Sequence, residues 1–87
     1  MNPEHIKTGV CTIVVSEKSK ARPFSEWVAH EKTYKGTIVA KCDNGLVFAA
    51  FEPVYFTRVY YYGQILKYAP HNYTFEEYAR RLEEAER

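Results

Sequence analysis

The sequence predicts an α+β fold: a small antiparallel sheet of four or five strands, with a short helix after strand 1 and a C-terminal amphipathic helix. Three observations predict this fold. Residues 51–68 are rich in aromatic and β-branched side chains, which favour strands. An Asp-Asn-Gly sequence at 43–45 separates two apolar runs, as hairpin turns do. Apolar side chains recur at helical spacing from residue 75 onward, so we expect the helices to pack mostly on one face of the sheet.

Length and composition fit one compact domain over residues 1–87, with residues 1–8 expected to fray. Apolar residues make up 46% of the chain and aromatic residues 16%, a composition that excludes a disordered tail. The net charge of +1 excludes a chain that binds nucleic acid through bulk positive charge. Because we find neither a secretory signal nor a membrane-spanning run, we expect a cytoplasmic location with free thiols at Cys11 and Cys42.

Residues 9–16 are predicted to form the first strand. Apolar side chains fall on both of its faces, which indicates a strand that is covered on both sides or central in the sheet. Residues 26–33 are predicted to form the short helix, with the Ser25 hydroxyl as its N-cap. An apolar stripe at helical spacing favours this helix; its members are Phe24, Trp27, Val28 and Tyr34.

The Asn-Gly pair at 44–45 supplies the positive φ angles that a tight hairpin turn requires, so residues 37–42 and 46–51 are predicted to pair. Two registers remain open. A two-residue loop pairs Ile38 with Phe51. A three-residue loop with a bulge at the glycine instead turns Ile38 to the face of the even-numbered residues of the second strand. Both registers bury apolar side chains, so the sequence does not choose between them.

The segment after this hairpin contains two interruptions. Pro53 breaks the ladder, so the strand at 54–62 is predicted to follow a bend or to lie on an edge. Gly63-Gln64 is predicted either as a tight turn into a fifth strand or as a bulge in one long strand. Residues 35–62 also suit a curled sheet, so the alternative fold is a small SH3-like barrel plus the C-terminal helix.

The C-terminal helix is predicted from about residue 75 to 86. Thr74 and Glu77 form a capping box, in which each side chain accepts a hydrogen bond from the other's backbone N–H. The opposite face carries two i,i+4 Glu–Arg pairs, which support the helix. The stripe predicted to join the core consists of Phe75, Tyr78, Ala79, Leu82 and Ala85.

Motifs for catalysis, cofactors and metals are absent from the sequence. His30-Glu31 begins like the zinc-protease helix motif, but Tyr34 stands where the second histidine would be. The cysteines and histidines lack the paired spacing of zinc ligands, and the four glycines are isolated. We therefore expect a protein that is not an enzyme and that carries no cofactor and no metal.

The tyrosines of 51–68 raise the question of function, because this segment holds five of the eight in the chain. One interpretation is structural, with buried rings and solvated hydroxyls. A second is a rigid contact patch of Tyr60 and Tyr62 with Arg58 on the same face, since tyrosine and arginine are enriched at binding hot spots. A third is the same face stacking on bases, fed by the basic residues of the 18–22 loop and Lys67.

Our first functional hypothesis is a small non-enzymatic protein-binding module, an inhibitor or adaptor that occludes a site on a larger partner complex. Small phage proteins that block host defence complexes, anti-CRISPR proteins among them, share this size and lack of motifs, a likeness of genre without a shared residue motif. The alternatives are single-stranded nucleic-acid binding and a homodimer paired through an exposed strand at 54–62. The predicted partner-binding residues are Tyr55, Arg58, Tyr60, Tyr62, Lys18, Lys20, Arg22, Glu76, Glu77, Glu83 and Glu84.

Overall fold

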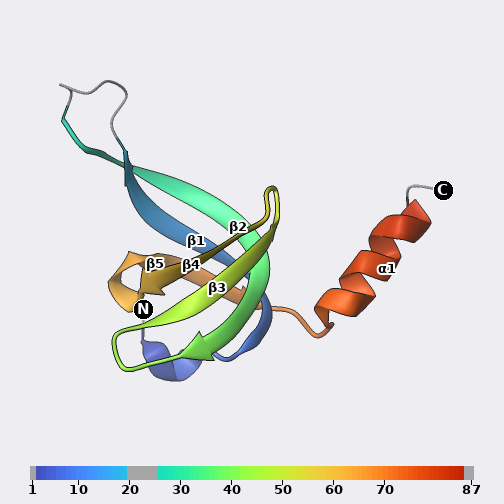
Figure 1. The fold of residues 1–87 in the computed structure, drawn as a ribbon. Helices are drawn as coiled ribbons and strands as arrows, with labels where there is room; N and C mark the ends of the chain where they lie inside the picture. The colour runs from blue at the N-terminus through green and yellow to red at the C-terminus, as the bar shows by residue number, and fades with distance from the viewer. Residues whose placement is uncertain (1, 20–25, 86–87) are drawn as a thin grey trace.

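The computed structural model of the chain describes residues 2–19 and 26–85 (Figure 1). These residues form a five-stranded antiparallel sheet and a C-terminal helix, so the broad α+β prediction is confirmed. The strands are β1 (Gly9–Ser19), β2 (Val28–Lys41), β3 (Gly45–Glu52), β4 (Phe56–Tyr61) and β5 (Ile65–Pro70). The helix is α1 (Phe75–Ala85), and short 3-10 turns cover Pro3–His5 and Tyr62–Gln64.

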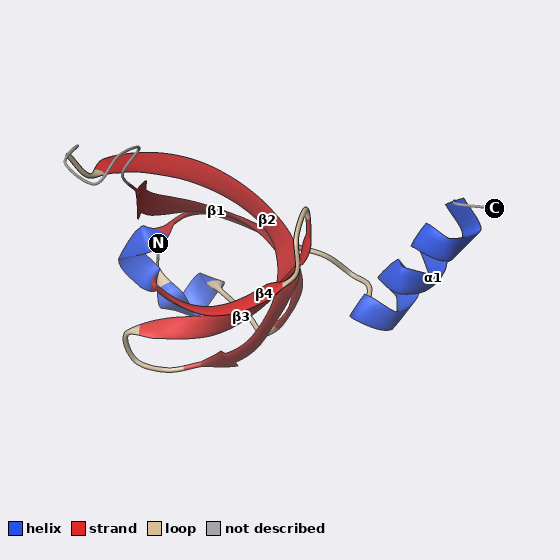
Figure 2. Ribbon diagram, turned by 45° about the horizontal axis from the view of Figure 1, so that its top comes forward, coloured by secondary structure: helices blue, strands red, loops and turns tan. Residues whose placement is uncertain are grey.

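The sheet has the strand order β4-β3-β2-β1-β5 and curls, so that one of its faces becomes concave (Figure 2). The concave side, here called the inner face, holds the core. Its buried strand residues are Cys11, Ile13, Val15, Ile38, Leu46, Phe48, Ala50, Tyr60 and Ile65. Ile6 is also fully buried, although it lies in the segment that the sequence predicts to fray.

The β1 strand lies inside the sheet, as the apolar side chains on both of its faces indicate. It pairs with β2 along its entire length, from Gly9 opposite Ile38 to Ser19 opposite Val28. Its other edge pairs with β5, beginning with Cys11 opposite Pro70. These two neighbours make β1 the strand that joins the β2–β3–β4 meander to β5.

The predicted short helix at 26–33 is wrong, because this segment belongs to β2 from Val28 onward. Ser25 and Phe24, its predicted cap and first stripe residue, lie outside the described residues. A helix of two turns has little stability of its own, whereas β1 offers a long edge with which the segment can pair. Backbone pairing with β1, such as Lys32 opposite Val15, therefore outweighs the helical spacing of the apolar residues.

The hairpin between β2 and β3 exists, but its turn differs from the prediction. No described non-glycine residue has a positive φ angle, and Gly45 has none either. Cys42 N–H donates to Gly45 O at 2.9 Å, so the loop is Asp43-Asn44. Gly45 is instead the first residue of β3, where a Cβ would collide with the carbonyl oxygen of Tyr60 on β4.

Neither predicted register describes the whole hairpin. Ile38 pairs with Phe48 and shares the inner face with it, as the three-residue loop requires. A register shift between Ile38 and Ala40 then pairs Ala40 with Val47, on the opposite face. The extra residue Val39 at this bulge is 59% exposed. The register therefore differs from both predictions, and only the face that the three-residue loop assigned to Ile38 is confirmed.

The segment after Pro53 follows the prediction in part. β4 lies at the edge of the sheet, and β5 is the fifth strand. The fifth strand is confirmed and the single bulged strand is excluded, but the predicted tight hairpin turn at Gly63-Gln64 is wrong. The connection is the 3-10 turn Tyr62–Gln64, and it joins strands at opposite edges of the sheet, which do not pair. Pro53, which lacks the N–H needed to continue a ladder, lies in the bend between β3 and β4, as predicted.

The α1 helix begins as predicted, but it does not join the core. Glu77 N–H donates to Thr74 Oγ1 at 3.2 Å, which confirms the N-cap. The predicted core stripe is wrong: α1 contains no buried residue among those described, and Phe75 and Leu82 are 40% and 41% exposed. Figure 1 shows the reason, since α1 points away from the sheet after its first turn.

Candidate protein-docking surface

Tyr60 and Tyr62 do not form an exposed patch; they are 1% and 8% exposed. Pairing of Tyr60 with Leu46 places it on the inner face, because Leu46 is itself fully buried there. The Tyr62 hydroxyl donates to Cys42 O at 2.8 Å. The rings of Tyr60 and Tyr62 are therefore buried rather than displayed as a contact surface, and their hydroxyls bond within the chain rather than to solvent.

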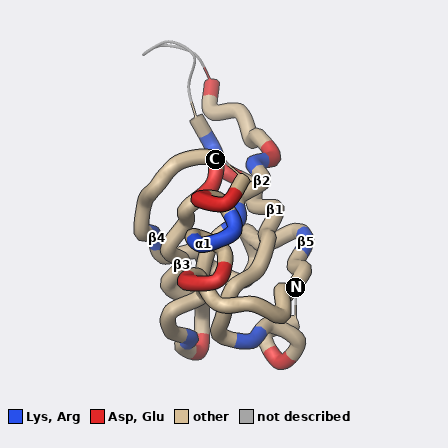
Figure 3. The backbone as a smooth tube through the Cα atoms, turned by 90° about the vertical axis from the view of Figure 1, so that its right-hand side faces the viewer, with Lys and Arg blue, Asp and Glu red and all other residues tan. Residues whose placement is uncertain are grey.

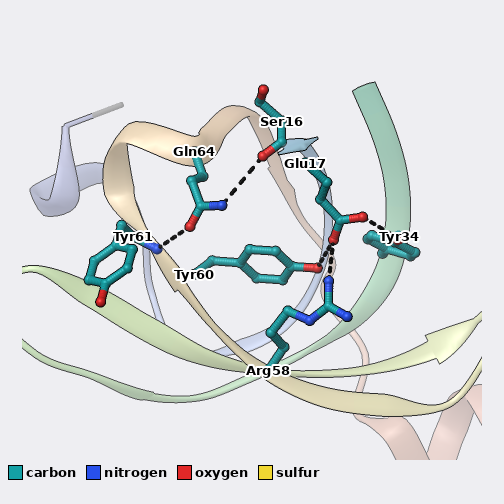
Figure 4. A network of polar contacts seen from close by, with 7 residues as sticks. All are labelled: Ser16, Glu17, Tyr34, Arg58, Tyr60, Tyr61 and Gln64. Carbon is teal, nitrogen blue, oxygen red and sulfur yellow. Dashed lines mark hydrogen bonds and ion pairs between the residues drawn. The ribbon is translucent and has the colours of Figure 1, made fainter. Parts of the chain in front are cut away.

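Arg58 does share a face with Tyr60, as predicted, but its partner is a carboxylate of the same chain (Figure 4). Glu17 Oε1 accepts hydrogen bonds from Tyr60 Oη at 2.6 Å and Arg58 Nη1 at 2.7 Å. Glu17 Oε2 accepts a third from Tyr34 Oη at 3.1 Å. Three donors therefore hold the Glu17 carboxylate at the rim of the inner face, where the side chain is 18% exposed.

This network has a structural role. Burial, then the hydrogen bond to Glu17, raises the pKa of both Tyr60 and Tyr34, so their hydroxyls remain protonated donors. Gln64 extends the link beside them: its Nε2 donates to Ser16 O at 3.4 Å, and its Oε1 accepts from Tyr61 N–H at 3.0 Å (Figure 4). Side chains therefore connect β1 to β4 and to the turn that follows it.

The outer face of β2, β3 and β4 is uncharged over two rows of paired residues, here called the outer-face patch. Its members are Thr37, Ala40, Val47, Ala49, Thr57 and Val59. All six are exposed or half-buried. Val59 is 55% exposed, and Tyr61, the next outward residue of β4, is 62% exposed. A sheet face that meets water normally carries polar side chains, so this patch has the composition of a covered surface.

The first turn of α1 packs at one end of the same face. Phe51 of β3 lies 5.0 Å from Phe75 and 4.4 Å from Tyr78, measured between ring centroids. The Tyr78 hydroxyl donates to Glu52 Oε2 at 2.9 Å. Burial, then Glu52, raises the pKa of Tyr78 to about 12. These contacts hold the start of α1 and leave the rest of its apolar stripe without a covering element.

The segment between β5 and α1 is held against β1. His71 N–H donates to Val10 O at 2.9 Å, and His71 Nε2 lies 2.7 Å from Thr12 Oγ1. Burial, then the charge of Lys35, lowers the pKa of His71. The start of α1 is therefore held from two sides: His71 before the helix bonds to β1, and Phe51 of β3 packs against the first helical turn.

A groove runs along the base of α1, here called the α1 groove. It consists of two adjoining cavities of about 220 Å³ and 350 Å³, which share Thr37 and Phe75 in their walls. The smaller extends over Ala49 to Tyr55, and the larger extends over Val10 to the 71–74 segment. The groove thus begins on the outer-face patch and ends beside the helix.

The remaining predicted contact residues are dispersed. Tyr55 is 75% exposed and lines the α1 groove. Lys18 is exposed on β1, far along the strand from the helix, and Lys20 and Arg22 lie outside the described residues. The four glutamates of α1 are exposed; Figure 3 shows the charges of the helix beside strands with few charges. Among the predicted contact residues that the structure describes, only Tyr55 lies in the groove.

Sequence reasoning missed the valines and phenylalanines of this surface. Val47 and Ala49 alternate with the buried Leu46, Phe48 and Ala50, so β3 is apolar on both faces. That pattern was a usable signal, since a strand apolar on both sides needs a second cover. From the sequence, the helices are expected to pack mostly on one face of the sheet, whereas α1 contacts only one end of the outer face.

The described residues show neither a cluster of metal ligands nor a membrane-spanning helix, and comparison with known proteins finds no match. Among residues 2–19 and 26–85, three or more histidine, cysteine, aspartate or glutamate side chains nowhere gather as metal ligands would. Over the same residues, no helix is long and apolar enough to cross a membrane. Comparison of the chain with protein-family models, with curated proteins and with solved structures finds no match.

Proposed function

We propose that the protein is a non-enzymatic protein-binding module that docks a larger partner through the outer-face patch and the α1 groove. The observation that carries this proposal is the exposure of an uncharged sheet face beside an amphipathic helix with an uncovered apolar stripe. Val59 is 55% exposed and Leu82 41% exposed, although they stand on the apolar sides of their elements. A partner that covers both gives each element the second apolar contact that its sequence pattern requires.

The free energy of burying apolar side chains favours the binding of such a partner. Complete burial of one valine side chain contributes about 1.5 kcal/mol, and several exposed apolar side chains lie close together on the patch. The small central residues, Thr37 and Ala49, leave the α1 groove open for a bulky side chain of the partner. Hot spots of protein interfaces are commonly anchors of this kind, packed into a pocket.

The sheet also has features of a known class of barrel. We infer an SH3-like barrel, on the strength of the strand order β4-β3-β2-β1-β5, the curl of the sheet and the 3-10 turn before β5 (Figure 2). Barrels of this kind serve many functions, so the fold alone does not select a partner. The narrower role, an inhibitor or adaptor of the type found among small anti-defence proteins, is supported only by small size and the lack of catalytic motifs.

Single-stranded nucleic-acid binding is not favoured by a specific observation. The stacking surface proposed for it consisted of Tyr60 and Tyr62, whose rings are buried. Arg58, the cation of that predicted face, donates to Glu17 within the chain. Protein docking therefore stands as the single candidate function.

A matched pair of substitutions tests the docking surface. Val59→Asp places a charge on the outer-face patch, whereas Val28→Asp places one on an equally exposed valine of the β1–β2 ribbon, with exposures of 55% and 53%. In quantitative pull-down from host lysate, we expect proteins captured by the wild type to be lost with Val59→Asp and retained with Val28→Asp. Leu82→Asp on α1 should reproduce the loss.

Circular dichroism provides the folding control, since all three substituted side chains are exposed and each variant should keep the wild-type spectrum. Capture that survives both Val59→Asp and Leu82→Asp in folded protein would show that the partner docks elsewhere.

A further inference from the structure

A third cavity, of about 260 Å³, lies beside the α1 groove and has a different character. Its walls are Lys35, Tyr73, Tyr78, Arg81 and Leu82. Tyr73 also lines the larger cavity of the groove, so the two spaces adjoin at this ring. The apolar groove therefore continues into a space that two cations border.

The two cations reach this space from different elements. Lys35 belongs to the middle of β2, and its Nζ lies 5.1 Å from the Tyr78 ring centroid and 5.7 Å from that of Tyr73. Arg81 belongs to the second turn of α1, and its Cζ lies 5.1 Å from the Tyr73 centroid. Cation–π contact with these rings restrains both side chains before any ligand arrives.

The aromatic walls are themselves ordered by stacking. Tyr73 lies between His71 at 5.2 Å and Tyr78 at 6.3 Å between centroids, with an interplanar angle of 13° to each ring. This row connects the segment before α1 to the first turn of the helix. The positions of Lys35 and Arg81 are thus set by a stack that is continuous with the base of α1.

The chain supplies little negative charge to these cations. Glu52 Oε2 is 3.9 Å from Lys35 Nζ, at the limit of an ion pair, and the same oxygen accepts the Tyr78 hydroxyl at 2.9 Å. Arg81 has no carboxylate within 4.0 Å among the described residues, so the predicted i,i+4 ion pair with Glu77 does not form, and neither does that of Glu76 with Arg80. The cavity consequently carries positive charge that a ligand can neutralise.

We propose that Lys35 and Arg81 form a carboxylate-binding subsite, and that the docked partner segment carries a bulky apolar residue close to an acidic one. The apolar residue fills the α1 groove over Thr37 and Ala49, and the Asp or Glu side chain enters the cavity between Lys35 and Arg81. The planar guanidinium of Arg81 suits two parallel hydrogen bonds to a carboxylate. This inference rests on the proposed protein-binding function and adds the chemistry of the partner.

A random library of 12-residue peptides, selected on the immobilised full-length protein, supplies the probe. We expect the selected peptides to combine a Leu, Phe or Trp with a nearby Asp or Glu. For one such peptide, replacement of the acidic residue by its amide should weaken binding about tenfold, as loss of a charge-assisted hydrogen bond does. Binding is measured by NMR titration of the ¹⁵N-labelled protein.

Variants of the protein locate the effect. Arg81→Gln and Lys35→Gln should each abolish the preference for the acidic peptide over its amide. Arg80→Gln is the matched control, because Arg80 is the neighbouring arginine of α1 and does not line the cavity. It should leave the tenfold preference unchanged.

The outcomes separate this inference from the proposed function. Peptides that shift the amides of Thr37 and Ala49 but bind equally well as acid and amide would overturn the carboxylate subsite alone. The same holds if Arg80→Gln removes the preference as effectively as Arg81→Gln. A selection that yields no peptide perturbing these amides would overturn both proposals.

Discussion

Tyr60 and Tyr61 are consecutive residues of β4, yet their surroundings differ completely. Tyr60 is 1% exposed on the inner face, where its hydroxyl donates to Glu17 at 2.6 Å. Tyr61 is 62% exposed on the outer face, next to Val59. The inner face is closed by apolar packing and a satisfied polar network. The outer face presents apolar side chains to water, and this contrast between the two faces is the basis of the proposed docking surface.

The same contrast appears along β3. Phe48 is fully buried between its neighbours, whereas Val47 and Ala49 lie on the outer-face patch. Both faces of this strand have a core-like composition, but only one has a core-like environment. Stability of the isolated chain should therefore depend on the inner face, and binding should depend on the outer one.

The largest expected effect comes from truncating an aromatic side chain on each face. Phe48→Ala should lower the free energy of unfolding by about 3–5 kcal/mol, because it opens a cavity in the core. Tyr61→Ala on the outer face should lower it by less than about 1 kcal/mol, because its ring is mostly solvated. Urea denaturation measures both. Similar losses for the two variants would remove the distinction between the faces.

An intermediate effect is expected from the Tyr60 hydroxyl. Tyr60→Phe should lower the free energy of unfolding by about 1.5 kcal/mol, since it deletes a partly buried hydrogen bond to a carboxylate. Tyr55→Phe is the control, because Tyr55 is 75% exposed, and it should have no measurable effect. Urea midpoints at neutral pH test the pair.

The pH dependence sharpens the same test. The pKa of Tyr60 in the folded protein is raised above 10.0, so the neutral hydroxyl is the form that folding favours. Its contribution is complete below about pH 10 and is lost as the pH rises above that value. Wild-type stability should therefore fall more steeply above pH 10 than that of Tyr60→Phe. Parallel pH profiles would argue against this role of the hydroxyl.

The smallest effect concerns the segment that leads to α1 on the outer face. Burial, then the charge of Lys35, lowers the pKa of His71 below 6.5. An NMR titration should show this lowered value, and Lys35→Gln should raise it toward 6.5 by removing the repulsion. An unchanged His71 pKa in the variant would show that the charge of Lys35 does not act on His71, and would contradict the placement of the Lys35 ammonium near the start of α1.

Much of the fold could be predicted because its signals are local. Asp43-Asn44-Gly45 marked the hairpin, Pro53 marked an edge, and Thr74 marked the start of α1. The helix predicted at 26–33 failed because the competing partner, β1, lies outside the window in which helical spacing is judged. Gly45 shows a similar limit, because the need for glycine at this position comes from the close approach of the Tyr60 backbone, which is distant in sequence.

The candidate site could not be predicted from the tyrosines. They indicated a contact patch of Tyr60 and Tyr62, which the structure buries. The sequence does not say which face of β4 turns inward, because alternate residues are apolar or aromatic on both sides. That choice depends on the pairing of Tyr60 with Leu46 and on the carboxylate of Glu17, which lies two strands away in the sheet order from β3. The uncovered stripe of α1 likewise depends on the direction in which the helix leaves the sheet.

The pairing of β1 with β5 has a consequence for the order of folding. The β2–β3 and β3–β4 contacts join neighbouring segments, whereas Cys11 must meet Pro70 from the far end of the chain. Closing so long a loop is slow compared with forming a hairpin, so the meander is expected to form before β5 pairs with β1. During that interval both faces of β3 are open to solvent at once. The uncharged surface proposed for docking is then also the surface most exposed to aggregation.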